Sequence, residues 1–198
     1  MVFALMLSAC GRREEGVRHY AEVGGPPLEE QPAGAGAQQN GMPPMMAAMM
    51  QGAADAPKLD WKTPEGWTEK AGGGPIVVSF AAGGADCALI AFPAMMAAAP
   101  VEQKIGIWLQ QIGAEPPSQE ALVSFIAKPQ KLKSSGGFDC EMYDFADLLG
   151  PSVQSSLLAA LFAADGKSLA VRMKGPPAAL VAQKQNFIAF LQSLRKKE

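Results

Sequence analysis

Histidine is almost absent from this chain, because His19 is the only one among 198 residues. Its scarcity excludes Ser-His-Asp triads, Cys–His pairs elsewhere in the chain and His-ligated zinc or iron. Basic charge is not in excess, with 17 Lys and Arg against 19 Asp and Glu. We therefore expect no nucleic-acid partner, since the main attraction for phosphates is missing. No apolar run reaches roughly 18 residues, so no membrane-spanning helix is expected.

Motifs that hold nucleotides are incomplete. The Gly72–Gly74 run is followed by Pro75 rather than by Lys and Ser or Thr. The segment Gly166–Ser168 has the right ending for a phosphate loop, but Leu161 stands where its first glycine belongs. Catalysis would rest on carboxylates or Lys184 alone, and we expect the Lys184 ammonium to reach solvent. We predict no cofactor and no enzymatic activity.

The first ten residues indicate export. An apolar stretch ending in small residues precedes Cys10, as in secretory signals. The residues Leu7–Cys10 (Leu-Ser-Ala-Cys) resemble the lipobox of bacterial lipoproteins, in which the cysteine is acylated and becomes the first mature residue. The resemblance implies lipidation of Cys10 and a membrane anchor that faces the periplasm in the bacterial cell envelope. Since no basic residue precedes Cys10, we expect the true start to lie upstream.

Residues 11–57 have the composition of a flexible linker. Residues 11–30 are polar and mixed in charge, and residues 31–57 contain no Val, Ile, Leu or aromatic residue. Such a segment buries too little apolar surface to offset its ordering entropy. As a random coil it would span roughly 35–40 Å, a length suited to a tether.

The linker contains a cluster of methionines. Thioether sulfur is a soft ligand for Cu(I), and the cluster would share one face of a helix. Pro43 and Pro44 oppose a helix, so we favour a low-complexity spacer. A periplasmic copper-handling protein remains the alternative function. The residues concerned are Met42, Met45, Met46, Met49 and Met50.

Residues 58–198 have the composition of a single folded domain. They contain all three tryptophans, all phenylalanines except Phe3, and nearly equal numbers of basic and acidic residues. Turns at Gly83-Gly84 and Asp165-Gly166 predict two hairpins. The apolar runs of the first hairpin predict burial on both faces. The expected strands are 75–80, 87–92, 130–133, 138–145, 157–162 and 169–173, of which 157–161 could equally be helical.

Helices are expected at three places. A period of 3.6 residues predicts one over 100–112, and Ser118 is the expected N-cap of a second. A third follows Gly175, with Arg195–Lys197 in its last turn. Together these patterns predict an α+β fold, a largely antiparallel β-sheet with helices packed on it. The apolar face of the third helix should contain Leu180, Val181, Phe187, Ile188, Leu191 and Leu194.

Four acidic residues lie in or just after the strand that is predicted over 138–145. They could bind Ca²⁺ or act as a carboxylate pair, but a period of two places Asp139, Glu141 and Tyr143 on the solvent side. We therefore expect a solvated face. The acidic residues are Asp139, Glu141, Asp144 and Asp147.

The domain resembles small bacterial lipoproteins of unassigned function that have a PsbP-like layout. The resemblance covers residues 60–195, and it implies an α/β/α sandwich in an envelope setting without implying an activity. The residue that follows Trp108 is Leu109, where the similar proteins carry an arginine. The residues that carry the resemblance are Trp61, Pro64, Gly66, Trp67, Trp108, Lys174, Gly175, Pro176, Phe187, Phe190, Leu191, Ser193 and Leu194.

Cys87 and Cys140 remain once Cys10 is assigned to lipid. An exported protein could join them in a disulfide, or they could be separate buried thiols, which we favour. No Cys-x-x-Cys motif indicates redox chemistry. We expect a non-catalytic, lipid-anchored module that binds another envelope protein or a small ligand through its sheet face or a cleft beside it.

Overall fold

The computed structural model describes residues 56–150 and 153–197. The predicted signal (1–10) and nearly all of the predicted linker (11–57) lie outside these residues. Cys10, His19 and the methionine cluster do so as well. None of the helices in the described part combines the length and the apolar character needed to cross a membrane.

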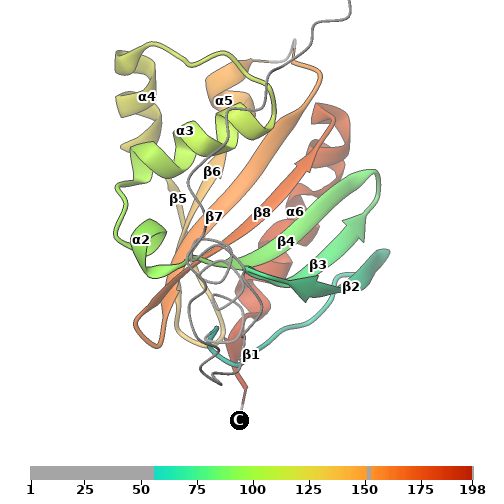
Figure 1. The fold of residues 1–198 in the computed structure, drawn as a ribbon. Helices are drawn as coiled ribbons and strands as arrows, with labels where there is room; N and C mark the ends of the chain where they lie inside the picture. Colours follow the sequence, from blue (N-terminus) through green and yellow to red (C-terminus); the bar gives the residue numbers. More distant parts are fainter. Residues whose placement is uncertain (1–55, 151–152, 198) are drawn as a thin grey trace, which may run out of the picture. The chain divides into compact units, whose positions relative to one another are not determined.

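Seven strands form one antiparallel sheet in the order β2-β3-β4-β8-β7-β6-β5 (Figure 1). Consecutive strands pair as hairpins, and the pairing of β4 with β8 joins the two halves of the sheet. The strands are β2 (Trp67–Gly73), β3 (Ile76–Ala82), β4 (Ala85–Ala91), β5 (Gln130–Lys133), β6 (Asp139–Asp144), β7 (Ser156–Ala164) and β8 (Lys167–Gly175).

Both predicted hairpin turns are confirmed. Gly83 and Gly84 have φ values of 57° and 90°, and Asp165 and Gly166 have values of 49° and 71°. Two successive left-handed residues are what a two-residue type I′ turn requires. The second turn also settles the assignment of residues 157–161, which lie in β7 rather than in a helix.

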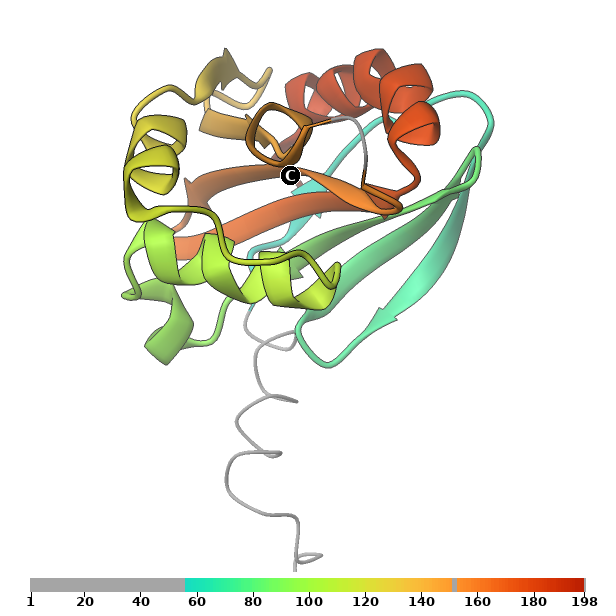
Figure 2. The same ribbon diagram turned by 90° about the horizontal axis from the view of Figure 1, so that it is seen from above.

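Helices cover both sides of the sheet. The helix α6 (Pro177–Ser193) packs on one face, and α3 (Val101–Gln111) and α4 (Gln119–Ile126) lie on the other (Figure 2). Ser118 caps α4 as expected, because its hydroxyl accepts a hydrogen bond from the Ala121 amide at 3.2 Å. Two short helices, α2 (Ala94–Ala97) and α5 (Ala146–Leu149), complete the second layer. The predicted α+β fold class, an antiparallel sheet with helices packed on it, is confirmed.

Each layer has its own hydrophobic core. Under α6, the rings of Trp67, Phe80 and Phe190 lie within 5.2–5.7 Å of one another, measured between centroids. Under α3, Trp108 and Phe145 pack against residues of β6, β7 and β8. The sheet therefore buries apolar side chains on both faces in its β6–β8 half.

The end of the chain differs from the sequence expectation. Helix α6 stops at Ser193, and Arg195–Lys196 form the strand β9, which pairs with β1 (Leu59–Asp60). Arg195 Nε donates to Asp60 Oδ2 at 2.8 Å, and this bond lowers the pKa of the Asp60 carboxyl. The predicted basic last turn is therefore wrong. Val181, placed on the apolar face, is 74% exposed because that position turns away from the sheet.

Candidate functional site

Half of the sheet face on the α3 side is open to solvent. Helix α3 packs over β6, β7 and β8, and no helix among the described residues lies over β2 and β3 on that side (Figure 2). Ser79 and Ala88 on this face are only half-buried, and Asp86 is exposed. The prediction that the first hairpin is buried on both faces is therefore wrong. Most of its apolar residues face the α6 core, and Ile76 and Ile90 at one end of the hairpin face the α3 side.

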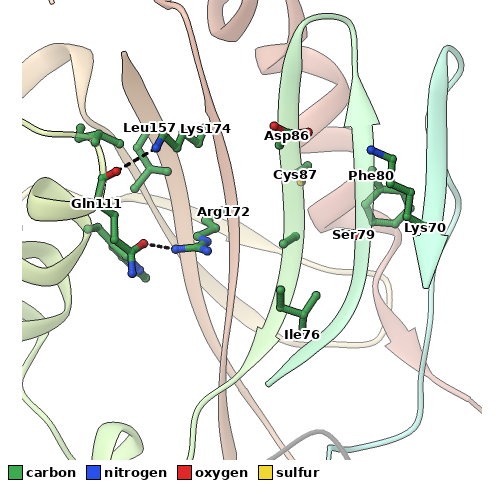
Figure 3. A pocket seen from close by; sticks show the side chains of 13 residues that line it. Lys70, Ile76, Ser79, Phe80, Asp86, Cys87, Gln111, Leu157, Arg172 and Lys174 are labelled. Carbon is green, nitrogen blue, oxygen red and sulfur yellow. Dashed lines mark hydrogen bonds between the residues drawn. The ribbon is translucent and has the colours of Figure 1, made fainter. Parts of the chain in front are cut away.

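A cavity of about 470 Å³ lies where this open face meets the end of α3. We call it the charged pocket, because Lys70, Arg172 and Lys174 line it together with a single carboxylate, Asp86 (Figure 3). Its volume is within the range of small-molecule pockets. Arg172 and Lys174 lie on β8 and Lys70 lies on β2, far earlier in the sequence, so only the sheet brings Lys70 to the other two cations.

The strand register explains this arrangement. Lys70 of β2 is opposite Ser79, and Ser79 is opposite Ala88 of β4, which in turn is opposite Arg172 of β8. Residues opposite each other in a sheet point to the same face. The small side chains of Ser79 and Ala88 thus form a low floor between Lys70 and Arg172. With a spacing of roughly 4.8 Å per strand, the two cations lie across a floor roughly 14 Å wide.

Helix α3 holds two of the three cations through its last residue. The Arg172 guanidinium donates to the Gln111 side-chain oxygen, and Lys174 Nζ donates to the Gln111 carbonyl at 2.8 Å (Figure 3). Both acceptors are uncharged. Arg172 is half-buried, and this burial lowers its pKa, whereas Lys70 and Lys174 are exposed. Within the described residues, Lys70, Arg172 and Lys174 take part in no ion pair.

A second cavity, of about 230 Å³, adjoins the charged pocket. We call it the apolar pocket, because Phe92, Met96 and Ile107 are among its walls. Lys104 of α3 also lines it, and this residue is only 6% exposed. Its Nζ donates to the Ala97 carbonyl at 3.2 Å and lies 5.3 Å from the centroid of the Phe92 ring. Burial lowers the pKa of Lys104.

A third cavity, of about 410 Å³, lies at the β6 edge between α4 and α6. Here Lys184 Nζ is 2.7 Å from Asp144 Oδ2, so the expectation that this ammonium only reaches solvent is incomplete. Asp147 also lines the cavity. Burial, reinforced by the nearby Glu141, raises the pKa of Tyr143 to about 12. The ion pair neutralises Lys184 within the site, whereas the cations of the charged pocket have no such partner.

Comparisons with known proteins give little further information. No family model matches the chain. No curated protein matches it either. Among solved structures, the chain is similar to a protein of unknown function from Pseudomonas aeruginosa, with 12% identity, coverage of 73% of this chain and 86% of that one, and a TM-score of 0.35. It is also similar to cyanobacterial PsbP from Synechocystis sp. PCC 6803, with 13% identity, coverage of 72% and 94%, and a TM-score of 0.37. No function is inferred from similarities at this level.

The two cysteines of the domain are not bonded. Cys87 lies on β4 and Cys140 on β6, and both are free and buried. Two strands, β8 and β7, separate them, which places them at least roughly 14 Å apart and beyond the reach of a disulfide. The disulfide alternative is therefore wrong. Burial raises the pKa of both thiols, that of Cys140 to about 11, and burial as apolar thiols accounts for both residues.

The described residues contain no cluster of His, Cys, Asp or Glu that could hold a metal ion. The acidic residues that were considered as a Ca²⁺ site or a carboxylate pair do not form one cluster, because Asp139 is exposed and pairs with Lys133 while Asp144 pairs with Lys184.

Sequence reasoning did not select the charged pocket. The available signal was the spacing of Arg172 and Lys174, two residues apart on a strand and hence on one face.

Proposed function

We propose that the domain is a non-catalytic binding module whose charged pocket takes an anionic group. One observation carries this proposal: Lys70, Arg172 and Lys174 surround a cavity of about 470 Å³ with only Asp86 to balance them. Arg172 is half-buried, and a half-buried cation without a counter-charge is unfavourable until an anion reaches it, whereas Lys70 and Lys174 are exposed and attract an anion through their charge. A bound anion would supply the counter-charge, and Gln111 already holds Arg172 and Lys174 through hydrogen bonds.

Pyrophosphate is a suitable first probe, because it is small, highly charged and without an apolar part. We expect it to produce saturable NMR shifts at Ser79, Ala88 and Gln111 in the full-length chain. Replacing all three cations by Gln should weaken binding at least roughly tenfold, since each charge-assisted hydrogen bond contributes about 1.5–3 kcal/mol. Added KCl should weaken binding as well, because the pocket is open to solvent.

A control with the same change in charge is available elsewhere on the domain. Lys62, Lys131 and Lys167 are exposed and line none of the three cavities described above. The triple variant Lys62→Gln, Lys131→Gln, Lys167→Gln should keep wild-type affinity. If both triple variants bind equally, or if the shifts do not saturate, the charged pocket is not an anion site.

The second part of the proposal concerns where the module acts. The Leu7–Cys10 sequence and the composition of residues 11–57 support a lipid-anchored envelope protein with the domain on a tether. Acyl chains on Cys10 would supply the anchor, since each buried CH₂ contributes about 0.8 kcal/mol. The partner would then be a ligand or protein of the same compartment.

Intact-mass measurement of the native protein extracted from membranes tests the anchor. We expect a chain that begins at Cys10 and carries the added mass of acyl groups. The Cys10→Ala variant should appear in the soluble fraction, whereas Cys140→Ala should stay with the membrane. A soluble, unmodified native chain would contradict the anchor and would leave the pocket proposal unaffected.

A further inference from the structure

The charged pocket and the apolar pocket are two ends of one groove. Both are lined by Ile76, Trp108, Gln111 and Arg172, so the cavities adjoin along the side of α3. The lining of the groove changes from charged to apolar along the strands, since β4 presents Asp86 at one end and Ile90 at the other. A ligand lying along α3 would therefore meet cations at one end and hydrocarbon at the other.

The apolar end has no acidic lining residue. Its polar lining consists of Lys104, Gln111 and Arg172, and its walls include the half-buried Phe92, Met96 and Ile107. Lys104 is 6% exposed and, within the described residues, makes no ion pair. The groove as a whole thus has a positive net charge, and its single carboxylate, Asp86 opposite Lys174, lies at the charged end and not beside the hydrocarbon chain.

The floor of the groove favours a chain without peptide bonds. Strands β3, β4 and β8 are internal, with a neighbouring strand paired on each side. Their backbone donors and acceptors are already used in the sheet, so a peptide lying on them would leave its own amides without backbone partners. An alkyl chain carries no such groups and loses nothing on this surface.

We infer that the ligand of the groove is a monomeric single-chain amphiphile with an anionic head group. The head group binds Arg172 and Lys174 beside Gln111, and the hydrocarbon chain enters the apolar pocket between Phe92 and Ile107. This inference rests on the proposed function, because it assigns the charged pocket to the head group. It adds that a small anion alone uses only half of the site.

Decanoate and butyrate are the probes that separate the two halves, because they share a carboxylate and differ in chain length. In titration calorimetry of the full-length chain, decanoate below its micelle concentration should bind at least roughly tenfold more tightly than butyrate. Ile107→Asn should remove most of this difference and leave butyrate unchanged. Arg172→Gln should weaken both ligands, and Val181→Asn, on the exposed face of α6, should weaken neither.

Failure of this inference differs from failure of the proposed function. If pyrophosphate binds but decanoate binds no more tightly than butyrate, the anion site stands and the amphiphile is wrong. If Ile107→Asn and Val181→Asn behave alike, the chain does not occupy the apolar pocket, and the inference is overturned. Binding only to vesicles of phosphatidylglycerol, with none to monomeric decanoate, would identify a membrane surface instead and would also overturn it.

Discussion

Replacing Phe190 by Ala should cost about 3–5 kcal/mol of the free energy of unfolding, the largest loss we expect from a single truncation in α6. Phe190 is fully buried, and its ring centroid lies 5.2 Å from that of Phe80 and 5.7 Å from that of Trp67. It also lies 6.4 Å from the ring of Trp61 beside β1. One truncation therefore loosens the contact of α6 with the sheet and with the start of the domain together.

Urea unfolding followed by circular dichroism measures this loss. Val181→Ala is the matched control, since it truncates an apolar residue of the same helix that is 74% exposed. We expect it to change the free energy of unfolding by no more than about 0.5 kcal/mol. Near-ultraviolet dichroism should change only for Phe190→Ala, because Trp61 and Trp67 lose a neighbouring ring. Similar losses in the two variants would contradict the placement of α6 on the sheet.

Local sequence patterns predicted much of this fold because their physics is short-ranged. The Gly83-Gly84 and Asp165-Gly166 turns need left-handed backbone conformations, which these residues adopt readily, and both hairpins are present. Ser118 caps α4 through a hydrogen bond to a residue only three positions away. The helix expected over 100–112 is observed as Val101–Gln111 for the same reason, a regular apolar stripe.

Features that depend on long-range packing were missed or misjudged. Strand β2 has only Trp67 buried, so its remaining exposed residues gave no alternating pattern. Tyr143 was expected on the solvent side, but it is 3% exposed because α4 places Phe125 over it, with ring centroids 5.6 Å apart. No pattern within a strand shows which helix will cover it.

The residues of the charged pocket were missed for the same reason, because long-range strand pairing brings them together. Lys70 and Arg172 are about a hundred residues apart in the sequence, and only the pairing of β4 with β8 brings them to one face. Whether that face is open depends on where α3 ends across the sheet. Binding through a cleft beside the sheet therefore stays a prediction, and the residues that line such a cleft could be named only from the strand order. The distance between Cys87 and Cys140 likewise depends on the strand order, and the separate buried thiols that we favoured over a disulfide are observed.

Lys104 gives the other large effect that we expect. Replacing it by Glu should lower the free energy of unfolding by about 3–5 kcal/mol, because the new carboxylate would be buried without a counter-charge. The present ammonium donates to the Ala97 carbonyl and lies over the Phe92 ring. A carboxylate can use neither contact, since it has no proton to donate and the ring face is negative. Lys104→Met retains the length of the side chain and should be neutral or stabilising.

The pH dependence of stability distinguishes a buried lysine from a solvated one. Burial lowers the folded-state pKa of Lys104, so the folded chain releases this proton at a lower pH than the unfolded chain. Its contribution to stability therefore rises with pH between the lowered folded value and the ordinary value of 10.5. Urea unfolding across this range should show the advantage of Lys104→Met over wild type shrinking as pH increases. The exposed Lys62 supplies the controls, and if Lys62→Glu and Lys104→Glu lose equal stability, Lys104 does not occupy a buried site.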